Sequence, residues 1–396
     1  MPNKHLVRMA INLRKKHPKL VQRGAKGLRE LGSVSSNVSR LLTPTDLGSR
    51  IKHANIELTV LCNLRCPMCW WWGANGIGPG LLKSNDPLVS KVLTRDEILA
   101  VLKQLKQHHS SVYFSGGEPF ARKDTTEIIE AASDMGLELS LTTNGLLLTD
   151  SIIDRLVRTR NLVTINVSID GPRDVHDAIR GAGTFDKSLR NVKKLFERRR
   201  TLNQPEVRIN TTITAAIIGR MRQFMRDVSD SGVDSISFQH LWFTDTLTAS
   251  HHKSALLSDF GISDKGVDSH VVVVPGKDYG ERVAAEISLL NSQPSPVPFT
   301  IHPRLTERQI VSYYSDLRYS KVKKCTAPWD GVIVKASGDV IFCPDEWITE
   351  FSIGNIREAP LQNLWNSERA RLFRRVLARR GLFPACTRCC AININV

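Results

Sequence analysis

Six short apolar runs recur along the first 240 residues at the lengths expected of buried strands. They are Ile56–Leu61, Ser111–Phe114, Leu137–Thr142, Leu162–Ser168, Val207–Thr212 and Ser235–Gln239. Segments with helical periodicity separate them, near 95–107, 124–135, 150–157, 185–198 and 217–230. The first of these helices opens with a capping box, Thr94 and Glu97. Strands that alternate with helices specify a parallel sheet, so the pattern predicts an α/β fold, a partial (β/α)6 TIM-like barrel.

The pattern loosens after the sixth strand. Residues 241–304 would overhang the barrel mouth, which makes them our candidate for substrate selection. Their histidines, His251, His252 and His270, are expected at the surface rather than at a metal, and the Pro-rich stretch 293–303 predicts a linker. We therefore divide the chain into a basic arm with a linker (1–50), the barrel (51–292), a linker with a bridging helix (293–324) and a C-terminal domain (325–396).

Charge sets the N-terminal arm apart. The 396-residue chain carries a formal net charge of +16, and residues 1–31 hold nine basic residues against one acidic residue, Glu30. Apolar residues recur in this arm at roughly helical spacing, with Pro18 as an expected break. It is either an interfacial helix that contacts anionic lipid or an acidic partner, or a solvated helix that caps the barrel. Nucleic acid is not expected, because no aromatic residues are interleaved for base stacking.

Targeting signals are absent from the sequence pattern. The basic N-terminus lacks the apolar core of a signal peptide, and no uncharged apolar run approaches the roughly 18 residues that span a bilayer. We therefore expect a cytoplasmic protein, with peripheral membrane contact through residues 1–31 as an open alternative. In that compartment the eight cysteines are expected to be reduced and to bind metal.

Three of those cysteines form one compact array. The first strand leads into Cys62-Asn63-Leu64-Arg65-Cys66-Pro67-Met68-Cys69, a C-x3-C-x2-C pattern. Closely spaced thiolates select zinc or an iron–sulfur cluster, and without a fourth local cysteine a cluster would keep one iron free of protein ligands. The alternatives are a zinc knuckle completed by a distant residue, or cysteines that only pack.

Polar turns follow the next three strands. The second strand ends in Gly116-Gly117-Glu118-Pro119, the third in Thr143-Asn144-Gly145, and the fourth in Ser168-Ile169-Asp170-Gly171, with His176–Gly181 beyond. The glycine pair lets backbone approach a ligand closely, and a guanidinium such as that of Arg180 can bind a carboxylate in bidentate fashion. These turns would gather at the carboxyl ends of the strands, where α/β barrels place their chemistry.

Together these motifs resemble the radical S-adenosylmethionine (radical SAM) superfamily. The resemblance implies that Cys62, Cys66 and Cys69 bind a [4Fe-4S] cluster whose fourth site takes the methionyl group of S-adenosylmethionine. The residues that it implies near this cosubstrate are Met68, Gly116, Gly117, Glu118, Pro119, Thr143, Asn144, Ser168, Asp170 and Arg180. Met68 stands where the family often has an aromatic residue near adenine, so a thioether contact is expected there.

A second cysteine set lies near the C-terminus. It comprises Cys325, Cys343, Cys386, Cys389 and Cys390, with a hairpin turn expected at 337–340. The set resembles a shortened SPASM, or twitch-type, domain with one auxiliary [4Fe-4S] cluster. That resemblance implies Cys325, Cys343, Cys386 and Cys389 as ligands and leaves Cys390 spare. An electron-transfer role and a purely structural role, like that of a zinc ribbon, both stay open.

The resemblance implies cleavage of S-adenosylmethionine to a 5′-deoxyadenosyl radical that abstracts hydrogen from a substrate carbon. We expect a two-electron oxidation or related modification of a small molecule, sugar or lipid-linked substrate, with a flavodoxin- or ferredoxin-type reductant. Asp330, Asp345 and Glu346 are candidate general bases. The alternatives are a peptide maturase that forms a thioether or carbon–carbon crosslink, and a noncatalytic iron–sulfur protein that docks on membranes or acidic partners.

Overall fold

The computed structural model describes residues 46–73, 76–83, 91–199, 204–344, 347–348 and 350–389. Residues 1–31 lie outside this range, so both hypotheses about the basic arm stay predictions. A compact unit begins at Gly48 and contains the sheet and its helices.

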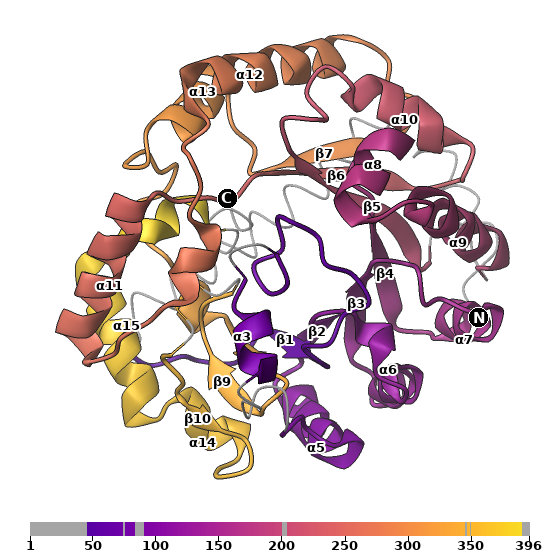
Figure 1. Cartoon of the computed structure of the whole chain (residues 1–396). Helices are drawn as coiled ribbons and strands as arrows, with labels where there is room; N and C mark the ends of the chain where they lie inside the picture. The colour runs from indigo at the N-terminus through magenta and orange to yellow at the C-terminus, as the bar shows by residue number, and fades with distance from the viewer. Residues whose placement is uncertain are drawn as a thin grey trace, which may run out of the picture. The chain divides into compact units, whose positions relative to one another are not determined.

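A ten-stranded sheet organises this unit, in the order β10-β9-β8-β1-β2-β3-β4-β5-β6-β7 (Figure 1). Its strands are β1 His53–Glu57, β2 Ser111–Ser115, β3 Glu138–Thr143, β4 Leu162–Ser168, β5 Glu206–Ile213, β6 Ser235–His240, β7 Phe299–His302, β8 Gly331–Val334, β9 Asp339–Ile341 and β10 Gly354–Asn355. The pairs from β8 through β1 to β7 are parallel, and only β8–β9 and β9–β10 are antiparallel. This arrangement confirms the predicted α/β fold with a parallel sheet.

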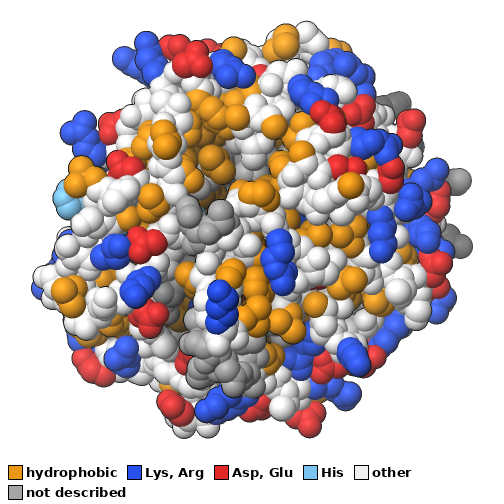
Figure 2. All heavy atoms as spheres, in the orientation of Figure 1, with side chains coloured by type: hydrophobic (Ala, Val, Ile, Leu, Met, Phe, Trp, Pro, Cys, Tyr) orange, Lys and Arg blue, Asp and Glu red, His pale blue; other side chains and the backbone are white. Residues whose placement is uncertain are grey.

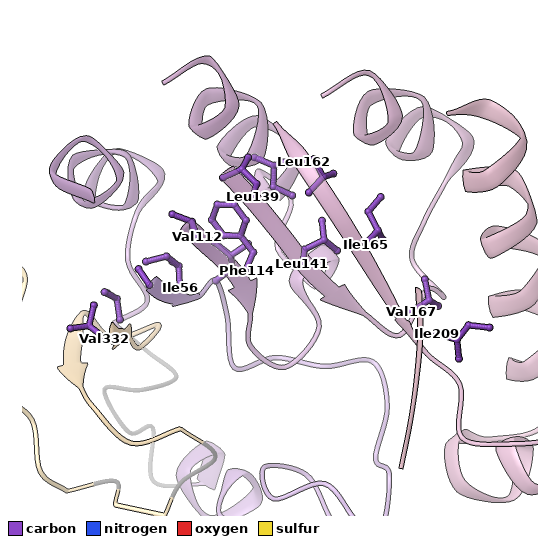
Figure 3. Packing of buried hydrophobic residues seen from close by; sticks show 14 of the residues in the cluster. Ile56, Val112, Phe114, Leu139, Leu141, Leu162, Ile165, Val167, Ile209 and Val332 are labelled. Carbon is purple, nitrogen blue, oxygen red and sulfur yellow. The ribbon is translucent and has the colours of Figure 1, made fainter. Parts of the chain in front are cut away.

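Helices cover the outer face of the sheet (Figure 1). They are α3 Gly78–Lys83, α5 Arg95–Gln107, α6 Thr125–Asp134, α7 Asp150–Arg158, α8 Arg173–Arg180, α9 Thr184–Arg198, α10 Met221–Ser229, α11 Thr246–Phe260, α12 Gly276–Ser292, α13 Glu307–Ser315, α14 Leu361–Trp365 and α15 Glu368–Arg380, with short 3-10 turns η1 Pro119–Ala121, η2 Gly266–His270, η3 Ala327–Trp329 and η4 Pro384–Arg388. Alternate strand residues such as Val112, Phe114 and Leu141 are buried between sheet and helices, as Figure 3 shows. This layer is the main hydrophobic core.

The other face of the same strands is polar. Side chains alternate across a strand, so the neighbours of the buried residues point to the inner face. There Ser115 donates from its hydroxyl to Asn55 Oδ1 over 2.6 Å, and Tyr113 donates to Thr142 Oγ1 over 2.7 Å. A closed eight-stranded barrel fills its interior with bulky apolar side chains. This open sheet instead presents hydrogen-bonding groups inward.

Several predicted elements are confirmed and two need correction. The capping box of α5 forms in full, and β4 has the predicted limits. The first strand was predicted at 56–61, but pairing with β2 ends soon after Glu57, and the buried residues Leu58 and Val60 lead into the cysteine loop. The linker predicted at 293–303 is wrong at Phe299–His302, because these residues form β7 and pair with β6. Phe299 of β7 also packs on Phe238 of β6.

The insertion after β6 does not form a free overhang. Its helix α11 packs on η4 of the C-terminal region, and His252 lies fully buried between them. His252 donates from Nε2 to the carbonyl of Trp347 over 2.8 Å and accepts at Nδ1 from the amide of Ala385 over 3.3 Å. His270 is also buried and stacks on Trp347 with ring centroids 4.2 Å apart. The surface prediction is therefore wrong for these two histidines, whereas the substrate-selection role of residues 241–304 stays a prediction.

Charged side chains are distributed around the surface, and apolar atoms gather nearer the centre of the face that Figure 2 shows. Along the described ranges, no helix is long and apolar enough to cross a membrane. The predicted peripheral contact concerns only the N-terminal arm, which the structure does not describe.

Candidate active site and a second cysteine cluster

The first cysteine loop is held in a fixed shape by its own backbone. The amide of Leu64 points at Cys62 Sγ over 3.4 Å, and the amide of Trp72 points at Cys69 Sγ over the same distance. Gly73 lies so close to the carbonyls of Pro67 and Cys69 that a Cβ atom could not fit there. These contacts turn thiols toward amide donors, which favours the thiolate form that metals bind.

Burial has the opposite effect, because it raises the pKa of a free thiol and so favours the protonated form. It raises the pKa of Cys66 to about 11 and that of Cys62 above its ordinary value. The neighbouring Cys69 raises the pKa of both, and Cys62 raises that of Cys66, so the three sulfurs lie close together. Three adjacent, partly desolvated thiols fit a cluster that supplies its own positive charge.

Trp70, Trp71 and Trp72 follow the loop and have different environments. Trp71 and Trp72 are buried, and Trp72 donates from Nε1 to the carbonyl of Val60 over 3.0 Å. The guanidinium of Arg65 lies over the Trp72 ring, 4.2 Å from its centroid. Trp70 is only partly buried. Two of the three indoles therefore pack beside the cysteine loop.

The GGEP turn packs directly against the strand that leads to the cysteines. A Cβ on Gly116 would collide with the carbonyl of Thr59, and one on Gly117 would collide with that of Leu61. Gly116 also has φ +130°, which favours glycine. The two glycines therefore allow the β2 turn and the cysteine loop to lie in contact.

Glu118 connects this turn to the end of β3. Its buried carboxylate accepts from the hydroxyl of Thr143 and the amide of Asn144, each over 2.7 Å. Burial raises the pKa of Glu118, while these donors lower it. Asn144 in turn donates from Nδ2 to Asn63 Oδ1 over 2.8 Å and lies 3.9 Å from Cys62 Sγ. Glu118 is thus an internal brace, and Asn144 is the group that contacts the cysteine loop.

Asp170 and Arg180 form a buried ion pair at the end of β4. Arg180 Nε lies 2.6 Å from Asp170 Oδ2, and Asp170 is 1% exposed. Arg180 lowers the pKa of Cys66 and is influenced by it in turn, so the guanidinium lies beside the cysteine loop. Its other nitrogens are available for the carboxylate that the resemblance implies.

His176 fixes the backbone at this pair. Its Nδ1 accepts from the amide of Asp170 over 3.1 Å, and burial lowers its pKa to about 4. A neutral ring with the proton on Nε2 is the form that this hydrogen bond requires. The sequence motif contained His176, but nothing in it indicated this bond.

Four cysteines of the C-terminal set converge. They come from three segments, with Cys325 before η3, Cys343 after β9 and Cys386 in η4 beside Cys389. Burial raises the pKa of each of Cys325, Cys343 and Cys386, for Cys325 to about 12, and neighbouring thiols of the set raise it further. In the described part of the chain, no three His, Cys, Asp or Glu side chains have the spacing for one metal ion.

The candidate bases fall in two groups. Asp345 and Glu346 lie outside the described residues. Asp330 lies just before β8, which runs parallel to β1, so it is at the opposite end of the sheet from Cys62. Its carboxylate pairs with Lys52 over 2.9 Å. The role of Asp330 as a general base stays a prediction, and from this position it would have to reach a substrate carbon near the other end of the sheet.

An open parallel α/β sheet with a three-cysteine loop at its carboxyl end and a four-cysteine C-terminal set defines the class of iron–sulfur barrel enzymes. Matches to two family models agree. Residues 56–236 match the radical SAM superfamily, and residues 325–390 match the SPASM iron–sulfur cluster-binding domain. The chain belongs to the radical SAM superfamily and carries a SPASM domain. It therefore binds S-adenosylmethionine and [4Fe-4S] clusters, as predicted.

Proteins similar to this chain differ in their activities. The chain is 23% identical over 352 residues to a tungsten-containing aldehyde ferredoxin oxidoreductase cofactor-modifying protein of Pyrococcus furiosus, covering 86% of this chain and 87% of that protein. It is 24% identical to an Fe-coproporphyrin III synthase of Methanosarcina barkeri, covering 84% and 79%. The structure of Streptococcus suis SuiB bound to the precursor peptide SuiA matches with a TM-score of 0.59 at 14% identity, covering 91% and 79%. This last likeness supports the fold alone.

Proposed function

We propose that this protein removes a hydrogen atom from a polar small molecule held against the inner face of the sheet, and that the net reaction is a two-electron oxidation or related modification. When bound, the cluster and S-adenosylmethionine supply the 5′-deoxyadenosyl radical. Cys62, Cys66 and Cys69 are the proposed ligands of that cluster. Asn144, Asp170 and Arg180 are proposed to position the cosubstrate, through the contacts described above.

The observation that carries this proposal is a polar row that begins at the ion pair. The amide of Thr212 lies 3.3 Å from Asp170 Oδ1. Thr212 is in register with Gln239 of β6, which is in register with His302 of β7. All three are only partly buried. A substrate along this row would meet hydrogen-bonding groups from the cosubstrate site to the edge of the parallel strands, which favours a hydroxylated or amide-rich molecule over an apolar one.

The second cysteine set gives the proposed oxidation its electron acceptor. We propose Cys325, Cys343, Cys386 and Cys389 as the ligands of an auxiliary [4Fe-4S] cluster. Four protein ligands leave no iron open to substrate, so we propose that this cluster transfers electrons rather than binding the substrate. The division of the chain at 51, 293 and 325 is part of this proposal, with β7 in place of part of the linker and α13 as the bridging helix.

Peptide maturation is the second candidate. It rests on SuiB, whose structure contains a precursor peptide, and on the open edge of the sheet beyond β7. The noncatalytic alternative is not carried further, because the cosubstrate turns come together around the cysteine loop.

The test is iron content together with 5′-deoxyadenosine formation by anaerobically reconstituted protein, given S-adenosylmethionine and a strong reductant. We expect about eight irons per chain, and the Cys62/Cys66/Cys69→Ala variant should lose about half of them and all cleavage. About four irons with intact cleavage would remove the auxiliary cluster and the oxidation with it. Protein with fully loaded clusters that cleaves no S-adenosylmethionine would refute the enzyme assignment.

A further inference from the structure

A basic pocket lies beside the second cysteine set. Its volume is about 350 Å³, and it opens between α11, the segment 317–323 and the segment 380–387. Its charged and titratable lining consists of His251, Arg318, Lys323 and Arg380, and no acidic side chain lines it. Hydroxyl groups of Thr248, Ser320 and Thr387 complete the polar lining. The pocket therefore fits an anionic group.

The pocket wall is made from the segments that carry the cysteines. Pro384 and Thr387 line it and flank Cys386 in sequence, and Lys323 lines it two residues before Cys325. The amide of Cys325 donates to the carbonyl of Gly381 over 3.1 Å, which places two basic segments side by side. Gly381 has φ +79°, and a Cβ there would meet the Lys323 carbonyl at 2.5 Å. This close contact holds the segment that contains Lys323 against the one that contains Arg380.

Positive charge surrounds the pocket. We call Arg318, Lys323, Lys324, Arg379 and Arg380 the basic rim. All five are exposed at least in part, with Arg380 paired to Asp259 and Arg318 to Asp316. Lys323, Lys324 and Arg379 form no ion pair within the described residues. Unpaired, exposed cations at a pocket raise the rate of encounter with an acidic partner.

We infer that the basic rim docks an acidic one-electron carrier protein of the flavodoxin or ferredoxin class, which exchanges one electron with the auxiliary cluster. This inference rests on the proposed function, which assigns that cluster to Cys325, Cys343, Cys386 and Cys389. No bond forms or breaks in the step: the auxiliary cluster, reduced by the substrate radical, loses one electron and the oxidised carrier gains it, and the same contact carries an electron the other way when a reduced carrier meets an oxidised cluster. Binding to an anionic membrane does not require a cluster beside the contact surface, whereas electron transfer from a docked carrier does.

The position of the rim separates this route from the cosubstrate site. Cys325 is close enough to Asp330, at the amino-terminal end of β8, for that carboxylate to raise its pKa. Cys62 follows the carboxyl end of the parallel strand β1. A carrier on the basic rim can therefore reach the auxiliary cluster without covering the carboxyl end of the barrel.

The experiment uses the holoenzyme with both clusters and measures reduction of the auxiliary cluster by photoreduced flavodoxin, followed by rapid-freeze electron paramagnetic resonance. The test variant is Lys323→Glu, Lys324→Glu and Arg379→Glu together. The matched control is Arg158→Glu, Lys187→Glu and Arg190→Glu, three exposed cations on α7 and α9 that make the same change in net charge. Iron content and far-ultraviolet circular dichroism verify that each variant is folded and loaded.

We expect the second-order rate constant at low salt to fall about tenfold or more in the rim variant and to change less than about twofold in the control. High salt should remove the difference between wild type and rim variant. Reduction by photoreduced methyl viologen, a small cation, should not fall in the rim variant.

Equal rates in the rim variant and the control, with about eight irons in both, would overturn the docking inference and leave the proposed function intact. About four irons in the wild type would overturn the auxiliary cluster and this inference together. An unchanged rate together with loss of binding to phosphatidylglycerol vesicles would overturn it in favour of a membrane contact.

Discussion

The two cysteine regions are built in opposite ways. Cys62, Cys66 and Cys69 lie within eight residues on one loop, and amides of that same loop point at two of their sulfurs. The C-terminal four come from three segments, and Cys386 and Cys389 are 7% and 5% exposed. A local loop can form its cluster site with little help from the rest of the fold. The second site exists only when distant segments are folded together, so its cluster also holds them together.

This difference predicts the largest effect, that of iron removal. Anaerobic chelation should lower amide hydrogen-exchange protection at least about tenfold along α15 and η4, because buried thiols from separate segments lose their shared partner. Protection in β2 and β3 should change less than about twofold. Hydrogen exchange with mass spectrometry of the loaded and stripped protein measures both.

The control for this prediction is the Cys62/Cys66/Cys69→Ala variant. Its change in exchange should stay within residues 62–73, where the loop is held by its own hydrogen bonds. A loss of protection that spreads equally through α5 and α15 in this variant would contradict the contrast between a local and a distributed site.

The same contrast explains what the sequence could predict. Periodicity placed β2 and β4 and the start of α5 well, because strand and helix patterns are local properties of the chain. The cysteine loop was also evident, since its ligands are neighbours in sequence. The sequence could not show that β7 pairs with β6 or that β8 lies beside β1, because both pairings join segments far apart.

Side-chain partners were harder to predict than elements. Glu118 looked like an acceptor for a ligand, but its carboxylate is bound to Thr143 and Asn144. His252 looked like a surface residue, but tertiary packing buried it between α11 and the C-terminal region. In both cases the deciding contact lies more than twenty residues away, and no periodic pattern encodes it.

A more local effect, confined to one ion pair, is expected at Asp170 and Arg180, which belong to the first region. Arg180→Lys keeps the charge but loses the planar donor set, so KM for S-adenosylmethionine should rise about tenfold with little change in stability. Asp170→Asn instead leaves a buried guanidinium without its counter-charge, which should cost about 3–5 kcal/mol. Steady-state cleavage kinetics and denaturant unfolding separate the two. Equal stability loss in both variants would show that the pair is only structural.

The smallest effect tests the link between the two regions. Arg357, from the SPASM domain, pairs with Glu97 of α5, with Nε 2.5 Å from Oε1 and an Nη nitrogen 3.0 Å from Oε2. The Arg357 hydrogen bond lowers the pKa of Glu97 from its ordinary 4.5 to about 2. Glu97→Gln can keep the capping box with Thr94 while removing the charge that faces Arg357. Its cost should be about 1 kcal/mol or less, because both side chains are partly exposed.

The pH dependence of this loss follows from the lowered pKa. A carboxylate with a depressed pKa stabilises the fold fully above pH 4.5, and this contribution disappears as the pH falls toward 2. The difference in unfolding free energy between wild type and Glu97→Gln should therefore be constant near neutral pH and shrink below pH 4.5. Asp96→Asn on the same helix turn controls for the loss of a negative charge near the helix N-terminus. If both variants lose the same stability at pH 7, the Arg357 contact contributes nothing, and the SPASM domain and the barrel are joined through their sheet and core alone.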